Sequence, residues 1–151
     1  MDPPQREHDI FKDTPVRLLG YANEVGEALR GFIGTKWVRF SYQVATLYVV
    51  ADTLDKTAKS LSRGKDTVTK TVFVTTDTLI WQMLASVIIP GFTINRVCAF
   101  TDYVLIRTKM PVTNRMVVVT GAGLAVIPFI IKPIDRLVDY LLDRSFRKLQ
   151  P

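Results

Sequence analysis

The feature that most constrains this chain is the stretch from residue 78 to residue 94, which holds seventeen residues without a charge. A run this apolar lies either in a protein core or in lipid. As a helix it would be roughly 25 Å long. Its seventeen residues are slightly fewer than the ~20 that span a bilayer comfortably. The stretch alone therefore allows either environment, and the rest of the chain has to decide.

Composition favours the membrane. The chain has 151 residues, which fits one domain, and 48% of them are hydrophobic. This is more apolar surface than a soluble core of that size needs. The net charge of +6 suits either an anionic lipid surface or nucleic acid. Because no cluster of five or more Lys or Arg occurs, we expect membrane lipids as a partner and no nucleic acid.

Two further apolar segments cover residues 37–51 and 116–131. The first is rich in aromatic residues near both ends, as segments that meet a membrane interface tend to be. The second contains Gly121-Ala-Gly123, a smooth patch that another helix could approach closely. The sequence therefore predicts an all-α, multi-pass membrane helical bundle with three to four apolar segments.

Amphipathic helices are predicted at both ends of this bundle. Thr14-Pro15 is a typical helix start. After it, apolar residues recur at helical spacing and charged residues are displaced from them. Near the C-terminus, Lys132-Pro133 restarts the chain, and a second apolar stripe runs from Ile134 to Leu149. The apolar positions of the first helix are Leu18, Ala22, Val25, Leu29 and Phe32, and its charged positions are Arg17, Glu24, Glu27 and Arg30.

Between these helices the sequence predicts a polar connection at residues 52–71, with a turn at residues 62–65. Pro90-Gly91 should kink or break the central segment, because proline removes a backbone hydrogen bond and glycine is a poor helix former. We expect residues 1–13, which are polar and contain two prolines, to form a disordered head. Residues 14–151 should form a single helical membrane domain.

Eight residues are candidates for structural or interaction roles. Arg39 intrudes into an apolar segment, where it either reaches the lipid headgroups or pairs with Asp77. Pro90 and Gly91 interrupt the central segment. Charges near the segment ends are expected to anchor the helices at the interface. The full set is Arg39, Asp77, Pro90, Gly91, Arg96, Pro133, Asp135 and Arg136.

Catalytic chemistry is not expected. One histidine and one cysteine cannot form a metal cluster, a disulfide or a Ser-His-Asp set. Gly121-Ala-Gly123 lacks the third glycine of a phosphate-binding loop. The carboxylate pairs Asp52/Asp55 and Asp135/Asp139 lie beside Lys or Arg and indicate solvated helix ends. We therefore predict no catalytic, cofactor-binding or metal residues, no cofactor and no enzyme activity.

Three strings resemble the mitochondrial fission process protein family, an 18 kDa inner-membrane family: RLLGYANEVGEALR at 17–30, DTLIWQMLASVIIPGFTINRVCA at 77–99 and IPFIIKPIDRLVDYLLDRSFRKLQP at 127–151. The similarity runs from about residue 11 to residue 151, and the loop at 57–71 departs from it. The resemblance implies a multi-pass protein of the mitochondrial inner membrane. It also implies a role in mitochondrial division and morphology, without catalytic activity.

Three functions compete at this point. The first is a regulator of fission that works with other inner-membrane or fission-machinery proteins. The second is a small carrier or channel subunit of the inner membrane. The third is a soluble bundle that binds partner helices. The charges between segments are too even for the positive-inside rule to select an orientation, and the sequence leaves open both the number of crossings and a homo-oligomer.

Overall fold

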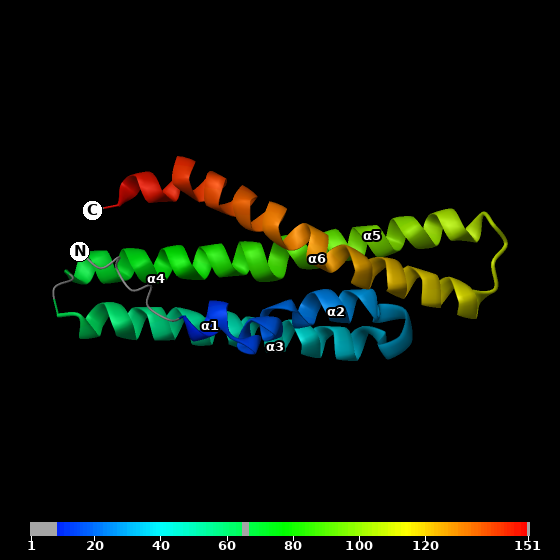
Figure 1. Ribbon diagram of the computed structural model, residues 1–151, viewed down its shortest axis with the longest axis horizontal. Helices are drawn as coiled ribbons and strands as arrows, with labels where there is room; N and C mark the ends of the chain where they lie inside the picture. Colours follow the sequence, from blue (N-terminus) through cyan, green and yellow to red (C-terminus); the bar gives the residue numbers. More distant parts are fainter. Residues whose placement is uncertain (1–8, 65–66, 151) are drawn as a thin grey trace.

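The computed structural model describes residues 9–64 and 67–150, and this part of the chain folds into an elongated bundle of antiparallel helices (Figure 1). No β-strand occurs in these two ranges, which confirms the prediction of an all-α fold. The long elements are α3 (Arg30–Ser62), α4 (Val68–Gln82), α5 (Ile89–Ile106) and α6 (Val112–Arg144), and the short π-helical stretch η2 (Met83–Ile88) joins α4 to α5. The short ones are α1 (Ile10–Asp13), η1 (Pro15–Tyr21), α2 (Ala22–Ala28) and η3 (Phe146–Leu149).

The N-terminal segment differs from the predicted single amphipathic helix. Thr14 caps the predicted start by accepting a hydrogen bond from the Val16 amide at 3.3 Å, but the first turns are a 3₁₀ helix, η1, followed by the short α2. The polarity is also the reverse of the prediction. Glu24 is completely buried, whereas Leu18 is 66% exposed. Asn23, Glu24 and Glu27 therefore face the other helices together with Ala28, whereas Leu18 and Val25 face outward.

Two glycines shape α3, one by kinking it near its start and one by following its end. At Gly34 the backbone leaves helical geometry with φ +77°, a conformation that favours glycine, soon after the chain has left α2. From there α3 continues to Ser62. The predicted polar connection at 52–71 is thus mostly helical, and the predicted turn is found at Gly64, with φ +61°. Asp52, expected in a solvated loop, is buried within α3.

The central apolar segment is one unbroken helix, Val68–Ile106. Of the two predicted outcomes at Pro90-Gly91, a kink or a break, the break does not occur, because a π-helical stretch, η2, precedes the proline. A π-helical turn contains an extra residue and changes which carbonyls need a donor, so a proline can follow it without ending the helix. The Asn23 side chain of α2 donates to the Val87 carbonyl at 2.9 Å, beside this transition.

The helix α6 contains both Pro128 and Pro133, so the chain does not restart at Lys132-Pro133 as predicted. Figure 1 shows α6 crossing the central helix at an angle, with its N-terminal half beside α5 and its C-terminal half on the side of α4. Of the predicted C-terminal stripe, Ile134, Val138 and Leu142 are buried in a cluster with Ala85, while Leu137 is exposed.

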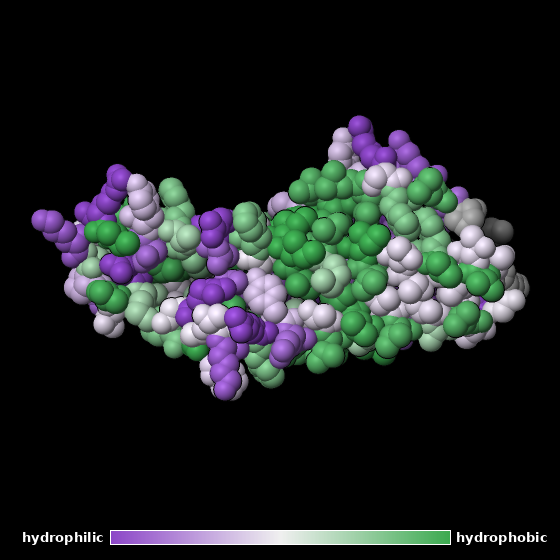
Figure 2. Space-filling view, turned by 180° about the vertical axis from the view of Figure 1, so that it is seen from behind, coloured by the Kyte–Doolittle hydropathy of each residue, from purple (hydrophilic) through white to green (hydrophobic). Residues whose placement is uncertain are grey.

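Two helices in the described residues are long and apolar enough to cross a membrane, Val68–Ile106 and Val112–Leu149. The prediction of three to four such segments is not confirmed. Only 22% of the most hydropathic window of each helix is buried, far less than expected of a core helix in a soluble protein. The space-filling view shows a broad hydrophobic area at mid-length of the molecule, flanked by hydrophilic groups (Figure 2).

The predicted head is partly described. Residues 1–8 lie outside the described residues. Ile10–Asp13 forms α1, and the Phe11 ring packs edge-to-face against Tyr48 of α3, with ring centroids 5.7 Å apart. The end of this head therefore contacts the bundle.

Candidate functional site

Buried polar side chains share the interior of the bundle with its apolar clusters. Burying such groups is costly unless they find hydrogen-bond partners. They come from the three helices α2, α3 and α4 and from η2, and they form three clusters along the bundle axis. The buried members used below are Asn23, Glu24, Glu27, Asp52, Gln82 and Ser86.

The first cluster surrounds Asp52, beside a cavity of about 130 Å³ between α3, α4, α6 and η3. Lys56 donates to the Asp52 carboxylate at 2.5 Å, and the Gln82 amide donates to its other oxygen. The Gln82 carbonyl then accepts from the Ser86 hydroxyl at 2.7 Å. This chain of hydrogen bonds connects α3 to η2 and ends close to Pro90.

Arg147 closes the other side of the same cavity. It donates to both oxygens of Asp77, at 2.9 and 3.1 Å, and also to Asp139 at 3.0 Å and Asp143 at 2.8 Å. Asp77 therefore pairs with Arg147, not with Arg39, the alternative raised from the sequence. Arg39 is exposed on α3.

Replacing Arg147 by glutamine should loosen the C-terminal end of the molecule, because Asp77 and Asp139 would lose their shared cation. Hydrogen bonds to charged groups contribute about 1.5–3 kcal/mol, so we expect a loss of roughly 2 kcal/mol in the free energy of unfolding. Amide hydrogen exchange should accelerate in residues 139–150. Arg144→Gln is the matched control, since Arg144 stacks on Tyr140 and makes none of these ion pairs. Equal effects of both variants would contradict this assignment.

The second cluster is built around Glu27. Arg30 donates to both carboxylate oxygens at 2.8 and 2.9 Å, Tyr42 donates to one at 2.8 Å, and Asn95 donates to the other at 3.1 Å. Burial raises the pKa of Glu27, but the hydrogen bonds from Arg30, Asn95 and Tyr42 outweigh burial and lower the pKa overall. Glu27 is therefore an ionised group that fastens α2 to α3 and α5.

The third cluster contains Glu24. Neither oxygen of its carboxyl group has a hydrogen-bond partner among the described residues, and Asn23 Oδ1 also lacks one. Arg17 and Asp135 lie near it and pair with each other at 3.4 Å. Burial raises the pKa of Glu24 to about 8; Arg17 lowers the pKa and Asp135 raises it by smaller amounts. The carboxyl group is consequently protonated at neutral pH.

The residues proposed from the sequence fall into two groups. Pro90 and Gly91 are buried, Asp77 pairs with Arg147, and Asp135 joins the cluster around Glu24 through Arg17. A Cβ atom at Gly91 would lie 2.5 Å from the Tyr42 hydroxyl oxygen and 2.9 Å from Asn23 Nδ2, so this glycine allows α5 to approach α2 and α3 closely. The other candidates lie on the surface: Arg39, Arg96, Pro133 and Arg136.

Sequence reasoning missed Glu24, Glu27, Asp52, Gln82 and Arg147 as interior or linking residues. Charged residues beside an apolar stripe are usually solvated. Their position beside the stripe therefore predicted exposed side chains, whereas Glu24, Glu27 and Asp52 are buried. The described residues hold no group of three or more His, Cys, Asp or Glu side chains that could bind a metal ion.

Comparison of the sequence with known protein families gives one match over more than half of the chain. Residues 53–142, from the second half of α3 to near the end of α6, match the family described as Mitochondrial 18 KDa protein (MTP18). The chain belongs to this family. Asp77, Gln82 and Gly91 all fall within the matched range of the MTP18 family.

Relatives named "Mitochondrial fission process protein 1" are similar over nearly the whole chain. The one from Danio rerio is 53% identical over 145 residues, 93% of this chain and 88% of the relative. The one from Homo sapiens is 52% identical over 149 residues, 96% and 90% of the two chains. The one from Caenorhabditis elegans is 48% identical over 146 residues, 93% and 88%. The match thus includes the α2 segment with Glu24 and Glu27. No solved structure matches the chain.

Proposed function

We propose that this chain is an integral protein of the mitochondrial inner membrane that promotes or regulates mitochondrial fission without catalysing a reaction. The names of its relatives and of its family support a mitochondrial role in fission. The hydrogen bonds and ion pairs of the clusters around Asp52 and Glu27 connect helices to one another. A structural part in shaping or organising the membrane suits them better than catalysis.

The observation that carries the membrane placement is the reversed polarity of the molecule. Glu24 and Asp52 are fully buried, while large apolar side chains of α5 and α6 such as Phe92 and Phe129 are exposed. Between Asp77 and Arg96 the central helix has eighteen uncharged residues, about 27 Å at 1.5 Å per residue, which fits a hydrocarbon core of ~30 Å. Lipid is the solvent in which such a surface is stable.

Alkaline carbonate tests this placement: the protein should stay in the membrane pellet. With two crossings, at Val68–Ile106 and Val112–Leu149, tags at the two termini should lie on the same side of the inner membrane, opposite the 107–111 connection. Protease protection in mitoplasts measures this arrangement. Release by carbonate would reject the membrane placement, and termini on opposite sides would reject two crossings.

The fission role is tested by changing the amount of protein. Depletion should give elongated, fused mitochondria, and excess should fragment them. Re-expression of the wild-type chain should restore the network after depletion. A network that stays unchanged in both experiments would reject a role in fission.

A second candidate is a small carrier or channel subunit, favoured by the polar cavity beside Asp52 and Arg147. Purified protein in liposomes should then pass an ion or metabolite, and Asp77→Asn should change the rate. Liposomes that stay tight would reject this candidate.

In the fission proposal the partners are other inner-membrane or fission-machinery proteins, or a second copy of the chain, which would contact the exposed apolar faces.

A further inference from the structure

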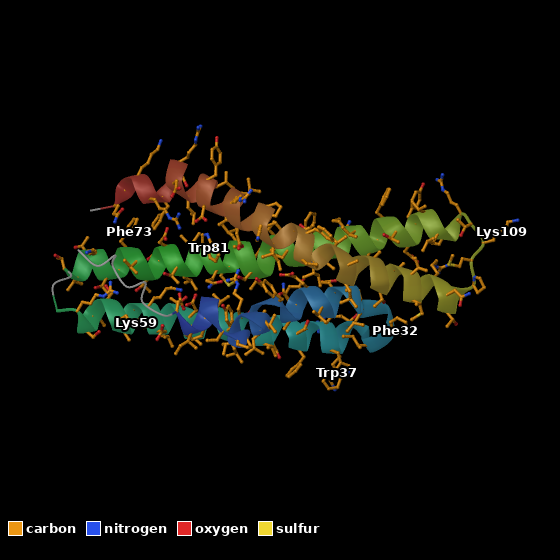
Figure 3. All side chains as sticks on the ribbon, in the orientation of Figure 1. Phe32, Trp37, Lys59, Phe73, Trp81 and Lys109 are labelled. Atoms are coloured by element: carbon orange, nitrogen blue, oxygen red, sulfur yellow. The ribbon has the colours of Figure 1, made fainter. Side chains whose placement is uncertain are left out.

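A pocket of about 420 Å³ lies among α2, α5 and α6, towards the end of the bundle where Lys109 is labelled (Figure 3). This volume falls in the range of small-molecule binding sites. One wall is apolar and includes Cys98, Met116 and Val119, while Arg30 and Arg115 lie at its edge with their carboxylate partners. The pocket thus combines an apolar wall and two guanidinium groups, as a site for an amphiphile would.

Both arginines have N–H groups left for a further hydrogen-bond acceptor. Arg115 donates from Nε to Asp102 at 2.7 Å, and its two Nη groups have no acceptor among the described residues. Arg30 uses Nε and Nη2 for Glu27 and keeps Nη1. A guanidinium group with unused donors favours a phosphate or carboxylate, whose oxygens match its planar geometry.

The surroundings of the pocket favour an anion that belongs to a lipid. Residues 27–39 and 95–115, which line or flank it, contain seven Lys or Arg and two acidic residues, a net charge of +5. Exposed aromatic rings lie in the same two segments, among them Trp37, Phe100 and Tyr103. Basic and aromatic side chains together are typical of a surface that meets anionic headgroups. A soluble anion would leave the apolar wall uncovered.

We propose that this pocket binds one anionic phospholipid, with its phosphate on Arg115 and Arg30 and an acyl chain against Cys98, Met116 and Val119. The proposal rests on the membrane location proposed above. It adds a defined lipid site that would hold α2 against α5 and α6 at this end of the bundle.

Cys98 provides a reporter inside the pocket, because it is the single cysteine of the chain and is partly exposed. The full chain, purified in detergent, is alkylated with a maleimide in the presence of phosphatidylglycerol, phosphatidylcholine with the same acyl chains, or inorganic phosphate. Phosphatidylglycerol should slow the reaction about five-fold more than phosphatidylcholine, because the choline cation of phosphatidylcholine offsets the charge of its phosphate and is repelled by the two arginines. Inorganic phosphate should have no effect. Equal slowing by both lipids, or slowing by inorganic phosphate, would overturn the proposal.

Arg115→Gln should abolish the difference between the two lipids. Arg107→Gln is the control of equal charge, since Arg107 is exposed at the same end but does not line the pocket. If both variants lose the difference equally, general charge and not the pocket binds the lipid, and the proposal fails. Val119→Trp, which fills the pocket without changing charge, should reduce the phosphatidylglycerol that co-purifies with the helical protein. If the Val119→Trp variant retains as much phosphatidylglycerol as the wild type, the proposed site is also wrong.

Carbonate extraction distinguishes an error in the proposed lipid site from an error in the proposed membrane placement. In membranes, Arg115→Gln should remain in the pellet after alkaline carbonate, whether or not it binds lipid in the pocket. Extraction of the wild-type chain by carbonate would reject the membrane placement itself.

Discussion

Glu24→Gln is expected to stabilise the bundle at pH 8 and above, and to leave its stability almost unchanged at pH 4. The folded state raises the pKa of Glu24 from 4.5 to about 8, mainly through burial. Below pH 4.5 the carboxyl group is protonated in both the folded and the unfolded chain. As the pH rises towards 8, the unfolded chain ionises and the buried group does not, so the wild type loses stability across this window.

The neutral glutamine removes this loss. At 1.36 kcal/mol per pKa unit, the variant should gain about 3–5 kcal/mol relative to the wild type at pH 8. Chemical unfolding in detergent, followed by circular dichroism from pH 4 to pH 9, measures the difference. The charged groups near Glu24, Arg17 of η1 and Asp135 of α6, are the same in both proteins. A difference between the two proteins that does not change with pH would refute the buried, protonated state of Glu24.

Glu27→Gln is the matched comparison on the same short helix and should behave in the opposite way. The pKa of Glu27 is lowered in the folded state, so its contribution is present above pH 4.5 and disappears as the pH falls. The variant should lose about 1–3 kcal/mol at neutral pH, because the charge-assisted bond from Arg30 is lost. Its deficit should shrink in acid.

Gly91→Ala should destabilise the packing of α5 against α2 and α3. The new methyl group would lie 2.5 Å from the Tyr42 hydroxyl oxygen, and Tyr42 cannot move freely because it donates to Glu27. Overpacking of this kind costs about 1–3 kcal/mol, and the lost hydrogen bond adds to it. The free energy of unfolding, measured in detergent, should fall by that amount.

Two variants make this result specific. Gly121→Ala is the control, since a Cβ atom at Gly121 meets nothing within 4 Å and alanine favours a helix by up to about 1 kcal/mol. Tyr42→Phe removes the hydroxyl oxygen and should recover part of the loss in the double variant with Gly91→Ala. A double variant no better than the sum of its parts would show that the contact with Tyr42 is not the cause.

The helical class and the turn at residues 62–65 could be predicted because they depend on local sequence. Long uncharged runs predict helices, and Gly64 occupies the expected turn. Two of the predicted apolar segments form helices long and apolar enough to cross a membrane, but α3 does not. The apolar part of α3, residues 37–51, is only fifteen residues long and contains Arg39.

The interior could not be predicted because the partners of its polar groups come from distant parts of the chain. The rule that charges face outward assumes that no such partners exist inside. Glu27 lies inward, where Tyr42 of α3 and Asn95 of α5 donate to it. The proline at position 90 was misjudged for a different reason, since a π-helical turn depends on hydrogen bonds that the sequence does not display.

The π-helical segment Met83–Ile88 also fixes how the two halves of the central helix are oriented around its axis. One residue corresponds to about 100° of rotation in an α-helix, so the extra residue of the π turn offsets α5 from α4 by that amount. A chain one residue shorter here would turn α5 around its own axis. Gly91 would then face away from Tyr42, and Ile94 would leave the core it shares with Ala28 and Ile127. The spacing between Asp77 and Asn95 is therefore as constrained as the residues themselves.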